Sequence, residues 1–129
     1  MVRAADLGRL LRASGDILGV PRRAGVNVRL TGDAEIRQLN VRFMGVDEPT
    51  DVLAFPAGEH GRVGDVAISV ERAMAQSPDS PAELRLLAIH GLLHCLGHDH
   101  HDAPSAAVMV AAMRMLLRGQ PVPDLGLSP

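Results

Sequence analysis

The sequence has few aromatic side chains and only one cysteine. It contains no tryptophan or tyrosine, and its two phenylalanines are Phe43 and Phe55. Folds that bind single strands stack bases on aromatic rings, so this composition gives little sign of such a surface. Cys95 has no cysteine partner within the chain. We therefore expect no disulfide, a reducing cytoplasmic setting, and a Cys95 that acts as a small core residue.

Long apolar runs and a strong net charge are also missing. No run approaches the roughly 18 residues that a membrane span needs, and charges at the N-terminus interrupt anything like a signal peptide. The net charge of −2 argues against a strongly basic nucleic-acid binder. Residues 1–42 nevertheless hold eight arginines against four acidic residues. That part could contact phosphates, although ordinary solvated arginines explain it equally well.

The most informative stretch is residues 84–97, which is apolar apart from Arg85, His90 and His94. A helix that is apolar all round is a buried helix. Two residues four apart lie on the same face of a helix, with Cβ atoms roughly 6 Å apart. Two imidazole nitrogens can therefore converge on one ion. A lone buried histidine is usually a hydrogen-bonded core residue, but the combination found here favours a metal site.

The residues after the helix offer a third ligand. Gly97 is placed to end the helix, and the following turn can bring His100 back toward the other two histidines. Three nitrogen ligands with one open position are typical of a catalytic rather than a structural zinc. His98 and His101 are alternatives to His100 for the third ligand, and otherwise face solvent or a substrate cleft. Asp99 could orient a ligand histidine through its other N–H.

The length, the spacing of apolar residues and the positions of glycine and proline predict a single domain of 129 residues with both helices and strands. Helices are expected at 4–18, 34–43, 71–76 and 80–96, and again after residue 102 or 105; strands are expected at 26–30, 51–55 and 63–70. Ser80 is the expected N-cap of the histidine helix, in a capping box with Glu83. Pro56 favours an edge position or a strand end for its strand. Met109 and Met113 are expected to pack in the core.

Three segments resemble the YbeY family of rRNA-maturation endoribonucleases. Residues 90–100 (HGLLHCLGHDH) are similar to the family's metal signature except at Cys95. Residues 49–56 (PTDVLAFP) resemble its PTDVLSFP segment except at Ala54, and residues 64–68 (GDVAI) resemble a strand of the family. The order and the gaps agree from about residue 26 to residue 117.

The resemblance implies a zinc-dependent, single-strand-specific endoribonuclease of the bacterial cytoplasm. It would act in small-subunit rRNA 3′-end processing and ribosome quality control, with the ribosome or its small subunit as partner. His90, His94 and His100 would hold one zinc ion. The implied fold is α+β, a mixed sheet of about four strands flanked by helices, with a buried, metalloprotease-like zinc-ligand helix. Residues 1–118 would form the hydrolase domain and residues 119–129 a flexible tail.

One departure from the family concerns Met44. Relatives have an arginine that follows the aromatic residue matched by Phe43, and that arginine is regarded as functionally important. Met44 therefore puts the strength of RNA cleavage in question rather than the fold. Arg42 is nearby in sequence but on a different face of the expected helix.

Two other functions compete with this interpretation. The histidine spacing is also that of metzincin proteases, but those have glutamate as general base directly after the first histidine, where this chain has Gly91. A ribosome-assembly protein with a purely structural metal is the second alternative. The general base of the favoured reaction is unassigned, since Asp65 is as readily structural as catalytic.

Overall fold

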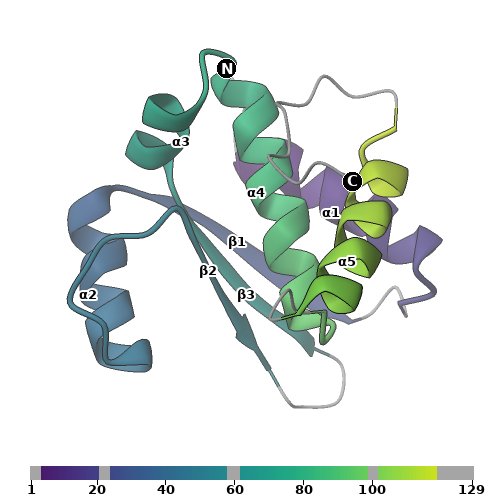
Figure 1. Ribbon diagram of the computed structural model, residues 1–129, viewed down its shortest axis with the longest axis horizontal. Helices are drawn as coiled ribbons and strands as arrows, with labels where there is room; N and C mark the ends of the chain where they lie inside the picture. Colours follow the sequence, from purple (N-terminus) through teal and green to yellow (C-terminus); the bar gives the residue numbers. More distant parts are fainter. Residues whose placement is uncertain (1–3, 21–23, 58–61, 99–101, 119–129) are drawn as a thin grey trace.

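The structure is a computed structural model that describes residues 4–20, 24–57, 62–98 and 102–118 (Figure 1). The elements, in chain order, are α1 (Ala4–Ile17), β1 (Gly25–Thr31), α2 (Asp33–Met44), β2 (Val52–Pro56), β3 (Arg62–Ser69), α3 (Val70–Gln76), α4 (Ser80–Cys95) and α5 (Ala103–Leu116). Each expected helix and strand is present, with ends that shift by a few residues at most. The tail predicted at 119–129 lies outside the described residues.

The sheet has the strand order β1-β3-β2 in the described part of the chain. The central strand β3 runs parallel to β1 and antiparallel to β2. The sheet is therefore mixed, as expected, but the expected number of about four strands is wrong for the described residues. The elements that follow β3 are all helices, which cover the sheet instead of extending it.

Strand β2 is at an edge of the sheet, as Pro56 predicted. It pairs with β3 from Val52 to Pro56, and its other side has no strand partner among the described residues. Proline is tolerated there because an edge strand does not need every N–H for its ladder. Strand β1 alternates exposed and half-buried residues, so its one-sided burial was also predicted correctly.

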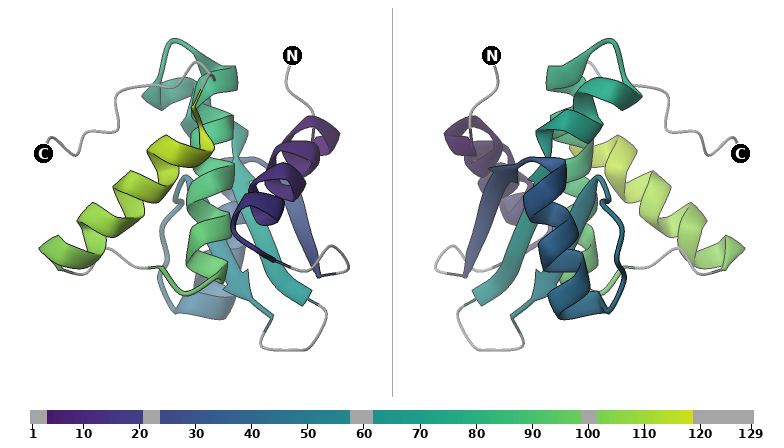
Figure 2. Two further views of the ribbon diagram at one scale, coloured as in Figure 1. Left: turned by 90° about the vertical axis from the view of Figure 1, so that its right-hand side faces the viewer. Right: turned by 90° about the vertical axis from the view of Figure 1, so that its left-hand side faces the viewer.

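Helices cover both faces of the sheet (Figure 2). Helices α1, α4 and α5 lie on one face, where Leu11, Val66, Ile68 and Leu93 belong to the main core cluster. Helix α2 lies on the other face and contributes Ile36 to a small cluster with Leu53 and Ala67. No helix in the described ranges is long and apolar enough to cross a membrane.

Helix α4 is the buried centre of the fold. Its buried residues are Ala82, Glu83, Leu84, Leu87, Ala88, Ile89, Gly91, Leu92 and Leu93. Met109 and Met113 of α5 are also buried in the main core, which confirms that they are packing residues. The nearly all-apolar stretch thus became the helix that the other elements surround, as its sequence predicted.

The predicted cap of α4 is wrong by one residue. Asp79, not Ser80, is the N-cap, and its carboxylate accepts a hydrogen bond from the Ala82 N–H at 3.1 Å. Glu83 does not complete a capping box, because its Oε2 accepts from Nε2 of Gln76 at 2.8 Å. Aspartate and serine cap about equally well, so the choice between neighbouring candidates depends on how α3 joins α4.

Candidate metal centre and groove

His90 and His94 face each other on α4, as predicted. Their Nε2 atoms are 3.0 Å apart and their ring centroids 4.6 Å apart. Two nitrogens that each bind a tetrahedral zinc at about 2.0–2.1 Å lie roughly 3.3–3.4 Å from each other. The pair therefore fits a shared zinc ion after a shift of a few tenths of an ångström. The same distance also suits a hydrogen bond between two neutral rings.

The end of α4 turns the chain as the glycine predicted. Gly97 has a φ of 98°, in the region that favours glycine. Its N–H donates to the His94 carbonyl at 3.0 Å, and the His98 N–H donates to the Leu93 carbonyl at 2.9 Å. These two bonds form a Schellman motif. The chain thus leaves α4 in a sharp turn directly after the second histidine.

The third ligand stays a prediction. Asp99, His100 and His101 lie outside the described residues. Among the residues that the structure describes, no group of three histidine, cysteine or acidic side chains is arranged to hold a metal. His98 is half-buried and follows the Schellman turn. The described part of the site is therefore the His90–His94 pair.

A groove of about 540 Å³ opens beside this pair, and we call it the histidine groove. It is bounded by α4, by strand β2 and by the end of α2. Its lining residues are Met44, Thr50, Asp51, Val52, Leu53, Ala54, Pro56, His90, Gly91 and His94. The two sequence motifs at 49–56 and 90–94 therefore form opposite walls of one groove. The resemblance of residues 49–56 to the family motif was the only signal in the sequence for a role of this segment, and no site residue was predicted there.

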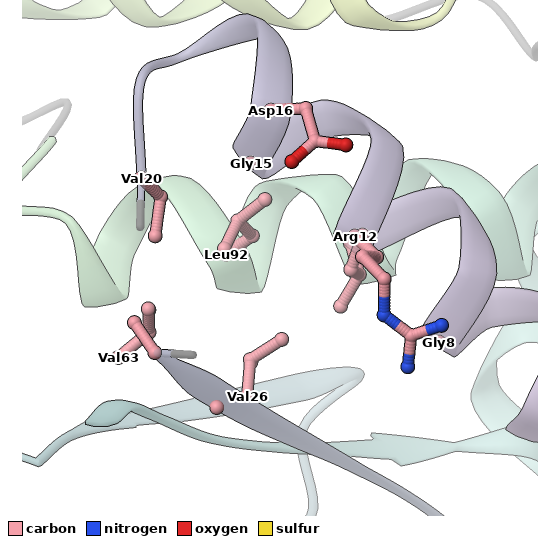
Figure 3. Close-up of a pocket in the computed structure, with 11 residues that line it drawn as sticks. Gly8, Arg12, Gly15, Asp16, Val20, Val26, Val63 and Leu92 are labelled. Atoms are coloured by element: carbon pink, nitrogen blue, oxygen red, sulfur yellow. The ribbon is translucent and has the colours of Figure 1, made fainter. Parts of the chain in front are cut away.

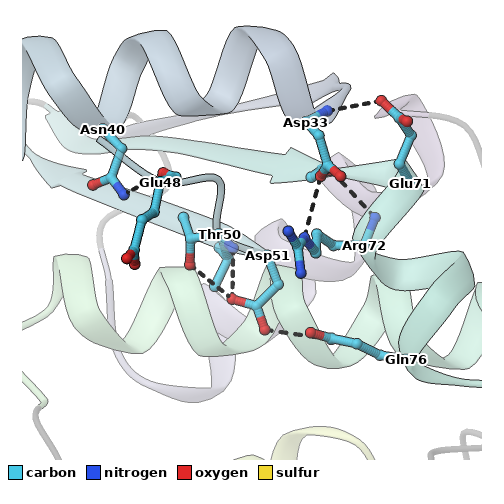
Figure 4. A network of polar contacts seen from close by, with 10 residues as sticks. Asp33, Asn40, Glu48, Thr50, Asp51, Glu71, Arg72 and Gln76 are labelled. Atoms are coloured by element: carbon cyan, nitrogen blue, oxygen red, sulfur yellow. Dashed lines mark hydrogen bonds and ion pairs between the residues drawn. The ribbon is translucent and has the colours of Figure 1, made fainter. Parts of the chain in front are cut away.

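Asp51 holds one end of the groove in place. Its Oδ1 accepts from the Val52 N–H at 2.8 Å, and its Oδ2 accepts from Nε2 of Gln76 at 3.4 Å (Figure 4). Gln76 also donates to Glu83, which is only 6% exposed. Burial raises the pKa of the Glu83 carboxyl, the Gln76 hydrogen bond opposes the rise, and the nearby charge of Asp51 adds to it. These contacts tie the start of β2 to α3 and to the first turn of α4.

A second polar group ties α2 to α3 (Figure 4). The Asp33 N–H donates to Glu71 Oε1 at 2.8 Å, and Asp33 Oδ1 accepts from the Ser69 hydroxyl at 2.7 Å. Arg72 approaches the same carboxylate at 3.4 Å. These residues join the start of α2 to the end of β3 and so have a structural role.

Asp65 and Cys95 have contacts that fit structural roles. Asp65 Oδ1 accepts from Nδ2 of Asn27 on the neighbouring strand at 3.0 Å. Sγ of Cys95 lies 3.9 Å from the Asp65 carbonyl oxygen. Burial, with a smaller contribution from the Asp65 charge, raises the pKa of the Cys95 thiol to about 11. Cys95 packs against the main core, so the expected core residue is confirmed.

Met44 and Arg42 occupy different places, as the helix spacing predicted. Met44 is half-exposed and lines the histidine groove. Arg42 is absent from the lining of the groove, and its Cζ lies 5.3 Å from the centroid of the Phe43 ring.

Three of the five arginines described within residues 4–42 pair with carboxylates. Arg9 pairs with Asp6, and Arg29 pairs with Glu35. Arg37 pairs with Asp47 at 2.7 Å, and its guanidinium lowers the pKa of the Asp47 carboxyl. These pairs favour the interpretation of ordinary surface arginines over a continuous phosphate-binding face.

A smaller cavity of about 160 Å³ lies on the other side of α4, between α1 and β1 (Figure 3). Leu92, Val26 and Val63 contribute apolar side chains to it, and Arg12 lies at its border. No histidine of the described ranges lines this cavity. Gly8 of α1 also lines it, and a Cβ on that residue would meet nothing within 4 Å. We interpret the cavity as a packing gap that a residue without a side chain leaves under α1.

Known proteins resemble this chain in sequence and in fold. The family model described as "Endoribonuclease YbeY" matches residues 4–119. Endoribonuclease YbeY of Moorella thermoacetica is 39% identical over 132 residues, which cover 89% of this chain and 85% of that protein. Endoribonuclease YbeY of Gloeobacter violaceus is 45% identical over 108 residues, and there the match covers 73% of this chain but only 56% of that protein.

A solved structure shows the same fold. The solution structure of TM1509 from Thermotoga maritima superposes with a TM-score of 0.59 and 27% sequence identity. The match covers 99% of this chain and 96% of that one. Since the family model spans nearly the whole chain and curated relatives align over most of their length, this chain belongs to the YbeY family.

Proposed function

We propose that this protein is a zinc-dependent endoribonuclease that cleaves single-stranded RNA during maturation of ribosomal RNA. The observation that carries the proposal is the His90–His94 pair, with Nε2 atoms 3.0 Å apart at the side of an open groove. The relatives named endoribonucleases support the reaction class. The finer expectations stay part of this proposal: the 3′ end of the small-subunit rRNA as substrate, ribosome quality control, and action in the cytoplasm on the ribosome or its small subunit.

His90 and His94 would hold the zinc ion, with His100 as third ligand. When bound, zinc lowers the pKa of a coordinated water toward about 7 and polarises a phosphoryl oxygen. The role of the surrounding residues is to hold the two imidazoles in place. Helix α4 is buried, so the two imidazoles are held on a rigid element, and the Schellman turn at Gly97 directs the following residues. Rigid support of this kind is what a precise site needs.

The walls of the groove suit an extended polymer better than a compact molecule. Strand β2 forms one wall along its length, and the groove is open to solvent. Among the described residues that line it, Asp51 is the only one with a carboxylate, and its oxygens accept hydrogen bonds from Val52 and Gln76. The other described lining residues, among them Thr50, have no negative charge, so only Asp51 repels a phosphate that approaches the histidines.

The proposal is tested with purified protein and a labelled single-stranded RNA that carries a precursor 3′ end of small-subunit rRNA. A duplex of the same sequence is the substrate control. We expect slow cleavage of the single strand, no cleavage of the duplex, and loss of cleavage in His94→Ala. Casein and peptide libraries should stay uncut.

Two outcomes would reject the proposal in favour of its alternatives. If the wild-type protein cleaves peptides and His94→Ala does not, the protein is a minimal zinc protease. Metal-dependent stability without cleavage of either polymer would show an assembly protein whose metal is structural.

A further inference from the structure

The two phenylalanines of the chain meet on the surface. Phe43, at the end of α2, and Phe55, in β2, have ring centroids 5.2 Å apart at an interplanar angle of 59°. Phe55 packs against the small cluster that includes Ile36 and Leu53. Phe43 is 56% exposed. The Phe43 ring thus packs against the Phe55 ring and presents much of its surface to solvent. We call these two rings the aromatic pair.

A free cation accompanies this pair. The guanidinium of Arg42 lies over the Phe43 ring at 5.3 Å from its centroid. Among the described residues Arg42 has no acidic partner within ion-pair distance, whereas Arg9, Arg29 and Arg37 each have one. An exposed cation beside an exposed ring is complementary to a nucleotide, which has a flat base and a charged phosphate.

The aromatic pair adjoins the histidine groove on two elements at once. Met44, the neighbour of Phe43, lines the groove, and so do Ala54 and Pro56 on either side of Phe55. Successive side chains of a strand point to opposite faces, so the Phe55 ring lies on the α2 face of the sheet, while Ala54 and Pro56 line the groove beside α4. The outer edge of β2 has no strand partner in the described part of the chain. A single strand that crosses this edge would meet the rings on the α2 face and the histidine groove on the α4 face.

We propose that Phe43, supported by Phe55, stacks against one base of the single-stranded RNA, while Arg42 turns from the ring to an adjacent phosphate. This inference rests on the proposed function and adds a subsite to it. Stacking on an aromatic ring tolerates any base, and arginine matches phosphate with its planar fork of donors. The continuity with the groove and the unpaired charge of Arg42 favour RNA over a protein partner at this surface.

The test measures binding of a single-stranded RNA labelled with a fluorescent adenine analogue, whose emission falls when its base stacks. The wild-type protein should quench this emission. Phe43→Leu keeps an apolar side chain but has no ring, so it should bind roughly five- to hundredfold more weakly and lose the quenching. Phe43→Tyr restores a ring and should restore both signals.

The charge is tested separately. Arg42→Gln should weaken RNA binding at low salt. It should also make the slope of log affinity against log salt concentration less steep, by the amount that one phosphate contact contributes. Arg114→Gln is the matched control and should change neither quantity. Arg114 is exposed and belongs to α5, a helix on the opposite face of the sheet from α2 (Figure 2). Metal content and circular dichroism verify that each variant is folded.

The outcomes separate this inference from the proposed function. If the wild type cleaves the RNA but Phe43→Leu binds and quenches as the wild type does, the subsite is wrong and the enzyme assignment is untouched. If Phe43→Leu changes only association with a protein, the surface is a protein interface and the inference is overturned. If the wild type neither binds nor cleaves single-stranded RNA, both fail. If Phe43→Leu does not fold, an unchanged salt slope in Arg42→Gln alone rejects the subsite.

Discussion

A Cβ atom added to Gly91 would lie 2.5 Å from Cγ1 of Val66 in the central strand. Val66 is 1% exposed and its branched side chain has little freedom to move. Helix α4 can therefore approach β3 at this level only because residue 91 has no side chain. The glycine next to His90 thus sets how deeply the histidine helix lies against the sheet.

The same contact bears on the protease alternative. Metzincin proteases place a catalytic glutamate directly after the first histidine. Here that position faces Val66 across a close helix–strand contact, and a glutamate side chain has no room there. The missing base is thus a consequence of packing as well as of sequence, which favours the endoribonuclease over the protease.

The first prediction is that Gly91→Ala destabilises the protein. Overpacking costs roughly 1–3 kcal/mol, which exceeds the gain of up to about 1 kcal/mol from replacing glycine by alanine within a helix. Urea unfolding should show a lower midpoint, and zinc affinity should fall because α4 is displaced. Gly8→Ala is the control: its Cβ would meet nothing within 4 Å, so it should be neutral or stabilising. Equal stability gains in both variants would contradict the close contact.

The second prediction concerns the metal. We expect the purified protein to contain about one zinc ion per chain, as three histidine ligands with one open position imply. His90→Ala and His94→Ala should lose the ion, and His100→Ala should bind it more weakly. His98→Ala should retain it. Elemental analysis with equilibrium dialysis measures all four variants, and full retention in both His90→Ala and His94→Ala would rule out this site.

The third prediction concerns Met44, which lines the histidine groove with an uncharged side chain. An arginine there could form a charge-assisted hydrogen bond with a phosphate, worth roughly 1.5–3 kcal/mol. Met44→Arg should therefore strengthen RNA binding by about one to two orders of magnitude, with fold and metal content unchanged.

Met74→Arg is the matched control for Met44→Arg. Met74 lies on α3, is 63% exposed, and does not line the groove. The same charge added there should have a much smaller effect on affinity for a labelled single-stranded RNA at fixed salt. If the two variants behave alike, the gain comes from net charge and Met44 has no contact with RNA.

The fourth prediction is a pH-dependent gain in stability from Glu83→Gln. Burial raises the pKa of the Glu83 carboxyl above its ordinary value of 4.5. Because the pKa of Glu83 is higher in the folded state than in the unfolded state, the stability contributed by its protonated form is complete below the unfolded-state pKa. That contribution is lost as the pH rises through the folded-state pKa. Glutamine cannot ionise and can still accept the hydrogen bond from Gln76. At about pH 7 the free energy of unfolding of Glu83→Gln should therefore be higher than that of the wild type. This difference should shrink toward about pH 4.

Glu48→Gln, which removes the same charge at an exposed site, is the control for this experiment. It separates the effect of removing one negative charge from the effect of removing a buried carboxyl. Urea unfolding across a pH series gives both curves. A Glu83→Gln difference that is the same at both ends of the series would mean that Glu83 has an ordinary pKa in the folded protein.

Local features of this protein could be predicted from consecutive residues. The spacing of His90 and His94 placed both rings on one face of a helix, and Gly97 marked where that helix ends. The alternation in β1 and the position of Pro56 indicated which strands have an exposed face or edge. Such features depend on helix period, strand period and backbone freedom, which are properties of a short stretch of chain.

Other features required the packed structure. The sequence predicted Ser80 as the cap of α4, but Asp79 has that role, and Glu83 contacts Gln76 instead of completing a capping box. The expected number of strands was too high for the described residues. The low aromatic content suggested no stacking surface, yet Phe43 and Phe55 lie in contact. Each of these outcomes depends on residues far apart in the chain.

The sequence by itself determined the elements, the histidine pair and the family to which this chain is similar. Only the tertiary structure decided what surrounds the pair: strand β2 as the opposite wall, Met44 at the groove, and the aromatic pair beside it. The physical reason is that periodicity fixes the direction of a side chain relative to its own element. Which other element it meets depends on how apolar faces from distant segments are buried against one another.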